Sequence, residues 1–201
     1  MNILIVFGTT EGHTRKIAQF TADQIRTKFD ATVIDSADPG IEDVKLHGFD
    51  GVIVAASLHV GRFQSSIEDF VRKRHQTLNG MRTLFLPVSL SAASKDDDDI
   101  KGLDRGLQQF GSETGWRPGQ THNVAGAFRF TQYDFFKRWG MKLIAYQKGV
   151  STDTSHDLEL TDWPALTRVI VDFLGVVEKS SVAAGKLNAA CKVLIQPRAE
   201  P

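Results

Sequence analysis

The feature that most constrains this fold is an apolar run near the N-terminus that ends in a loop of glycine and threonine. Residues 3–7 are continuously apolar, as is typical of a parallel strand buried on both faces. Residues 8–14 form the loop, and a helical pattern begins at about His13. A strand-to-helix turn of this kind directs backbone N–H groups and the positive end of a helix dipole at one point. The sequence therefore predicts a buried strand and an anion site side by side.

The composition of this loop indicates which anion it fits. The residue after Gly12 is His13 and not the lysine of a nucleoside-triphosphate loop, and the G-x-G-x-x-G spacing of a dinucleotide loop is absent. Three threonine hydroxyls supply further donors, which favours a single phosphate monoester such as that of FMN. The alternative is an ordinary turn, since glycine and threonine are common in turns. On the first interpretation the phosphate-binding residues are Thr9, Thr10, Glu11, Gly12, His13 and Thr14.

Further apolar runs alternate with amphipathic segments along most of the chain. Because strands that alternate with helices form parallel sheets, we expect an α/β fold: a doubly wound, five-stranded parallel sheet in the order 2-1-3-4-5, with helices on both faces. The remaining strands are predicted at residues 32–35, 51–57, 82–89 and 122–128. Pro87 makes the strand at 82–89 less regular, because proline cannot donate to a ladder. The helices are predicted at about residues 13–28, 65–78, 102–111, 133–148 and 161–174.

In such a sheet ligands bind beyond the carboxyl ends of the strands, where the strand order reverses. For this order the crevice lies between the first and third strands, so the loops after them converge there, with the loop after the next strand alongside. The first loop would hold a phosphate, and the other two would hold a flat ring. The ring-binding residues predicted in this way are Ser57, Leu58, His59, Val60 and Gly61 in one loop and Ser89, Leu90, Ser91 and Ala92 in the other.

Composition limits the class of protein. The 201 residues suit one domain, and a formal net charge of +0 argues against a nucleic-acid partner. The single cysteine, Cys191, fits a reducing compartment, and we expect a cytoplasmic protein because no apolar stretch approaches the roughly 18 residues of a membrane span. Residues 96–99 are four aspartates that belong in solvent or at a helix start, and the histidines lack ligand spacing, so no metal is expected.

The end of the chain differs from the rest in composition. After Gly175 it contains alanine, serine and lysine and then ends in a proline-containing segment. We therefore expect one domain over residues 1–174 and a C-terminal extension over residues 175–201, part of it disordered.

Several segments give the chain a resemblance to a known family. The first loop is similar to the [ST]-x-T-G-x-T phosphate loop of the flavodoxin family. Within that family the chain more closely resembles the menaquinone-dependent protoporphyrinogen oxidases than the electron-carrier flavodoxins. The segments that carry this second resemblance are residues 56–61, 70–73, 116–118, 125–130, 136–139, 141–144, 152–154 and 161–163.

The resemblance implies a flavodoxin-like fold, FMN as cofactor and the six-electron oxidation of protoporphyrinogen IX to protoporphyrin IX in haem synthesis, with a quinone as acceptor. Two alternatives remain open. An electron-carrier flavodoxin is one, although such carriers are usually strongly acidic and this chain is not. A flavodoxin-like subunit without flavin is the other. The chain also departs from both groups: Leu58, His59 and Leu90 stand where carriers stack aromatic rings, and the aspartate run replaces an expected basic segment.

Candidate reaction residues follow from the chemistry. His59 is a candidate proton relay because its unperturbed pKa lies near neutrality, and a surface histidine packed by the ring is the alternative. Arg62, Arg129 and Arg138 are candidates for the substrate's propionates, since arginine binds carboxylates bidentately.

The predicted helix at 133–148 is apolar on two sides, with basic residues between them. One apolar side contains Phe135, Phe136, Trp139, Leu143 and Tyr146, and the other contains Met141 and Ile144. A second apolar side favours a further partner: another copy of the chain, a bulky substrate, or the inner face of the cell membrane, which a lipid-soluble quinone would make useful.

Overall fold

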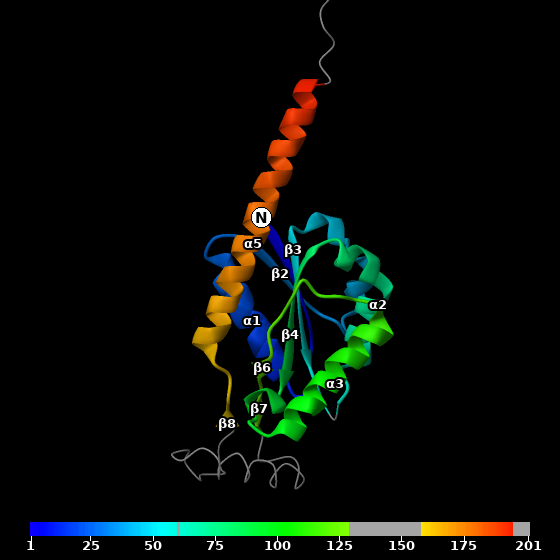
Figure 1. Cartoon of the computed structure of the whole chain (residues 1–201), viewed down its shortest axis with the longest axis vertical. Helices are drawn as coiled ribbons and strands as arrows, with labels where there is room; N and C mark the ends of the chain where they lie inside the picture. Colours follow the sequence, from blue (N-terminus) through cyan, green and yellow to red (C-terminus); the bar gives the residue numbers. More distant parts are fainter. Residues whose placement is uncertain (60, 129–157, 195–201) are drawn as a thin grey trace, which may run out of the picture.

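A computed structural model describes residues 1–59, 61–128 and 158–194. The parallel sheet has the strand order β2-β1-β3-β4-β5, with β6 also paired to β4, so the predicted order is confirmed. Helices α1 and α5 cover one face of the sheet, and α2 and α3 cover the other (Figure 1). The sheet strands are β1 Asn2–Gly8, β2 Asp30–Asp35, β3 Gly51–Ser57, β4 Arg82–Ser89, β5 Gln120–Thr121 and β6 Val124–Ala125. The helices are α1 His13–Arg26, α2 Ser65–Asn79, α3 Asp97–Thr114 and α5 Trp163–Leu194, with 3₁₀ turns at Pro39–Asp43, Leu46–Gly48 and Ser91–Ala93.

Two hydrophobic cores explain why β1 is apolar throughout. Successive side chains of a strand point to opposite faces, so Ile3, Ile5 and Phe7 pack with α1 and α5. Leu4 and Val6 pack with α2 on the other face. All five side chains are at most 5% exposed.

The last core strand is not the single strand predicted at 122–128. It is divided into β5 and β6, which pair with separate parts of β4, and into β7 (Ala127–Phe128), which pairs antiparallel with β8 (Leu158–Glu159). Pro87 accounts for the break. The carbonyls of Phe85 and Ser89 accept hydrogen bonds from the side of β4 on which β5 and β6 lie. Pro87, midway between them, faces the same side and has no N–H to donate. The interruption between β5 and β6 lies opposite it.

Helix α3 begins earlier than predicted, at Asp97 in place of Gly102. The side chain of Asp96 caps the helix by accepting a hydrogen bond from the backbone N–H of Asp98 at 2.9 Å. Three aspartates in the first turn then face the positive end of the helix dipole, which stabilises this end. The aspartate run is therefore a helix start, one of the two interpretations given above.

Helix α5 is also longer than predicted, because it continues past Leu174 to Leu194. Alanine, lysine and leucine are good helix formers, and the one interior glycine before Val177 costs only about 1 kcal/mol. Val177 is 1% exposed and belongs to the core on the α1 side. The last turns project beyond the sheet (red in Figure 1). The division into a domain over 1–174 and an extension stays a prediction, but the helix itself crosses that boundary. Among the helices of the described part, none is long and apolar enough to cross a membrane.

The core position of Val177 can be tested against a neighbour on the same helix. Val177→Ala should lower the free energy of unfolding by about 1–3 kcal/mol, because it leaves a cavity in the core. Val182 is 53% exposed, so Val182→Ala should change it by less than about 0.5 kcal/mol. Denaturant unfolding of both variants measures the difference, and equal effects would contradict the packing of α5 beyond Leu174.

Candidate functional site

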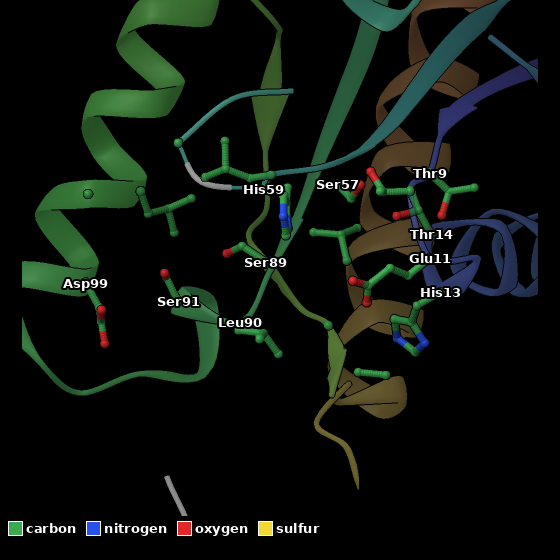
Figure 2. Close-up of a pocket in the computed structure, with 18 of the residues that line it drawn as sticks. Thr9, Glu11, His13, Thr14, Ser57, His59, Ser89, Leu90, Ser91 and Asp99 are labelled. Atoms are coloured by element: carbon green, nitrogen blue, oxygen red, sulfur yellow. The ribbon is translucent and has the colours of Figure 1, made fainter. Parts of the chain in front are cut away.

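A pocket of about 360 Å³ lies at the carboxyl ends of the central strands. The loops after β1, β3 and β4 meet there, as predicted, and the start of α3 and the segment between β6 and β7 complete the wall. Figure 2 shows Thr9, Thr14 and His13 on one side of the pocket and Asp99 on the other. The lining residues are Thr9, Thr10, Glu11, His13, Thr14, Ser57, Leu58, His59, Gly61, Val88, Ser89, Leu90, Ser91, Asp98, Asp99, Gly102, Leu103, Gly126 and Ala127.

Most of the residues predicted for the site line this pocket, and a few do not. Gly12 lies just outside the lining as the N-cap of α1, with φ of 89°, a left-handed conformation that favours glycine. Ala92 also lies outside, and its N–H donates to Ser89 Oγ at 3.1 Å, which holds the third loop together. Arg62 is exposed beside the second loop. The predictions for Val60, Arg129, Arg138 and the helix at 133–148 fall outside the described residues.

The hydroxyls of the first loop are arranged to donate to a ligand. Thr9 Oγ1 accepts a hydrogen bond from the N–H of Gly12 at 2.9 Å, and Thr10 Oγ1 accepts one from Gln64 Nε2 at 2.9 Å. Each hydroxyl therefore keeps its own proton for another acceptor. Thr14 is 1% exposed, and its Oγ1 has no hydrogen-bond partner within the described part of the chain. A buried hydroxyl without a partner is costly, so a bound anion at this position would satisfy it.

His13 is held by a short chain of hydrogen bonds. Its Nε2 lies 2.8 Å from Thr161 Oγ1, and Thr161 Oγ1 donates to the carbonyl of Ala125 at 2.7 Å. Because the Thr161 proton is used in that second bond, His13 Nε2 must carry a hydrogen and donate it. The orientation of the imidazole at the start of α1 is therefore fixed from the segment that leads into α5.

A salt bridge reinforces the same junction. Lys16 Nζ lies 2.5 Å from Glu159 Oε2, and Trp163 Nε1 donates to Glu159 Oε1 at 2.6 Å. Burial by itself would raise the pKa of Glu159, but hydrogen bonds from Lys16 and Trp163 and the charges of Lys16 and His13 hold it below the ordinary value. Glu159 thus stays ionised and ties β8 to the first turns of α1.

The second loop turns tightly at the mouth of the pocket. His59 and Arg62 exchange two backbone hydrogen bonds, of 2.9 and 3.0 Å, across a turn in which Gly61 has φ of 76°. Helix α3 lies close against this turn: a Cβ added at Gly106 would stand 3.1 Å from Leu58 Cδ1 and 3.4 Å from the Gly61 carbonyl oxygen. A residue larger than glycine at position 106 would therefore press on the loop.

Comparison with known proteins decides the family. A family model described as a flavodoxin domain matches residues 4–155. This chain belongs to the flavodoxin family. Membership of the flavodoxin family implies a flavin cofactor, which agrees with the phosphate-type loop and the three converging loops described above.

Two curated relatives agree with this assignment. The chain is 28% identical over 182 residues to a protein of Escherichia coli (strain K12) named protoporphyrinogen IX dehydrogenase [quinone], covering 90% of this chain and 99% of the relative. It is 30% identical over 172 residues to a protein of the same name from Leishmania major, covering 85% and 73%. The resemblance stated from the sequence is thus confirmed. A flavodoxin of Fusobacterium nucleatum, described as bound to flavin mononucleotide, aligns with a TM-score of 0.45 at 15% identity, covering 89% of this chain and 98% of that one.

The sequence alone missed part of the flavodoxin pocket. The sequence placed the aspartate run in solvent or at a helix start, and Asp98 is exposed, but Asp99 is half-buried, lines the pocket and accepts a hydrogen bond from Ser94 Oγ at 2.6 Å. If the helix had been predicted to begin at Asp97, with Asp96 as its cap, the position of Asp99 near the pocket could have been expected from the sequence. The described residues contain no cluster of histidine, cysteine, aspartate and glutamate that fits a metal ion. The residues missed are Val88, Asp98, Asp99, Gly102, Leu103, Gly126 and Ala127.

The buried Thr14 hydroxyl leads to a stability test on the protein without ligand. Thr14→Val should raise the free energy of unfolding by about 1 kcal/mol, because it removes a buried polar atom that has no partner in the described part of the chain. Thr21 is the matched control: it is buried in the same helix, but its Oγ1 donates to the Ile17 carbonyl at 2.8 Å. Thr21→Val should lower the same free energy by about 1 kcal/mol. Destabilisation of equal size in both variants, measured by urea unfolding, would contradict the assignment.

Proposed function

We propose that this chain is an FMN-dependent oxidoreductase that oxidises protoporphyrinogen IX to protoporphyrin IX, with a quinone as electron acceptor. The observation that carries the proposal is the buried Thr14 hydroxyl at the N-terminus of α1, which has no partner among the described residues and lies in the pocket where three loops meet. Two relatives named for this reaction support the choice of substrate and acceptor.

The residues present fit FMN. The hydroxyls of Thr9, Thr10 and Thr14 and the backbone at the start of α1 would hold the phosphate, with the imidazole of His13 beside it. The loops at 57–61 and 89–92 would enclose the ring. When bound, the flavin supplies the two-electron chemistry by taking up a hydride. Leu58 and Leu90, which line the pocket, would exclude water from the ring without stacking on it.

The roles of individual residues toward the substrate belong to the same proposal. His59 is exposed at the pocket mouth, where its imidazole can accept the proton that leaves the porphyrinogen nitrogen. Arg62 is exposed next to it and can pair with a propionate. Arg129 and Arg138 are proposed for the second propionate, from the segment outside the described residues. Contact with a membrane surface or with a second copy of the chain is proposed for the helix that the sequence predicts at 133–148.

Loss of the phosphate donors tests the cofactor. The double variant Thr10→Val with Thr14→Val should bind FMN about 100-fold more weakly, because two hydrogen bonds to a charged group are lost at about 1.5 kcal/mol or more each. Quenching of FMN fluorescence on titration measures the affinity. Thr77→Val, at an exposed position of α2, serves as the control and should change nothing. Unchanged FMN affinity in the double variant would refute the phosphate site.

An assay on the protein reconstituted with FMN tests the reaction. Protoporphyrin fluorescence should appear faster than in buffer and faster again when menaquinone is added, while the Thr10→Val, Thr14→Val double variant should lose the acceleration. If the protein binds FMN but leaves protoporphyrinogen unchanged, the proposed substrate is refuted and the proposed cofactor is retained. A stable one-electron form on stepwise reduction, without turnover, would favour an electron carrier.

A further inference from the structure

Gln64 joins the two loops that the proposed function assigns to the phosphate and to the ring. It is the N-cap residue of α2, yet its side chain makes no capping hydrogen bond. Its Nε2 donates instead to Thr10 Oγ1 at 2.9 Å and to Ser57 Oγ. One amide group therefore bridges the loop after β1 and the carboxyl end of β3.

The surroundings of Gln64 hold this bridge in place. A Cβ added at Gly8 would stand 2.9 Å from Gln64 Oε1 and would collide with Ile67 Cγ1, so the side chain lies directly over the end of β1. The Oε1 atom is buried and has no partner within the described residues. The amide thus gives both of its hydrogens to the site, and its oxygen takes no proton from the two hydroxyls.

The direction of these two hydrogen bonds has a chemical consequence. A hydroxyl that accepts from an amide N–H keeps its own proton for another acceptor. Thr10 and Ser57, which both line the pocket, can therefore donate to a bound ligand. A carboxylate in place of the amide would do the opposite, because it can only accept and would take both protons.

We propose that Gln64 is a positioning residue that fixes Thr10 and Ser57 as donors toward the flavin and couples the phosphate loop to the ring loop. The proposal rests on the proposed function, in that it takes FMN as the ligand. It adds a residue that does not line the pocket and acts through two that do.

The isosteric change Gln64→Glu tests the donor direction. FMN affinity should fall at least 10-fold, because the hydroxyl protons turn away from the ligand and a carboxylate lies near the phosphate. The loss should be larger for FMN than for riboflavin, which lacks the phosphate, whereas general damage to the site would weaken both equally. Gln76→Glu adds the same charge at an exposed position of α2 and should stay within two-fold of wild type. The thermal midpoint of the ligand-free Gln64→Glu protein shows whether the fold is retained.

A double-mutant cycle tests the route of action. Gln64→Ala should weaken FMN binding in the wild type but have little further effect in a Thr10→Val, Ser57→Ala background, because the groups through which it acts are gone. The same loss in both backgrounds would overturn the proposal, as would wild-type affinity in folded Gln64→Glu. If the wild-type chain itself fails to bind FMN, the proposed function falls and this inference falls with it. If the wild-type chain binds FMN and the Gln64 variants bind it equally well, the proposed role of Gln64 is refuted and the proposed function stands.

Discussion

Burial of β1 on both faces is the constraint on which the rest of the structure depends. Its side chains pack alternately against α1 and α5 on one face and against α2 on the other, and its backbone pairs with β2 and β3. A strand covered in this way can only lie in the middle of the sheet. The loop that follows it must therefore open at the centre of the carboxyl edge, between the loops of its neighbours. The position of the pocket is thus a result of packing in the core.

The polar groups of the pocket extend this arrangement. The amide hydrogens of Gly12 and Gln64 are given to Thr9 and Thr10, and Thr161 fixes the imidazole of His13 from the start of α5. These contacts come from three different parts of the chain and order the side chains around one helix N-terminus, where Thr9 and Thr10 keep their own protons for a ligand. A site that is ordered before its ligand arrives loses less entropy on binding. Within the described residues the buried Thr14 hydroxyl, which lines the pocket, has no partner to offset the cost of its burial.

Local patterns were sufficient to predict much of this molecule, and the exceptions have physical causes. The buried strands and the amphipathic helices were predictable because their periodicity reflects burial directly. The division of the last strand was not predictable, because it depends on which neighbouring strand Pro87 faces. That neighbour follows only from the register of β4. The length of α5 was not predicted, because the helix is held beyond Leu174 by the burial of Val177 in the core, which the local composition does not reveal. Asp99 was missed because its approach to the pocket depends on the cap at Asp96 and on the close packing at Gly106.

The central claim is that the loop between β1 and α1 holds the phosphate of a flavin. A crystal structure of the protein with FMN tests it most directly. We expect the phosphate at the N-terminus of α1, with one oxygen within hydrogen-bond distance of Thr14 Oγ1 and the ring between the loops after β3 and β4. A phosphate placed away from this loop, with Thr14 Oγ1 still unpartnered, would contradict the account.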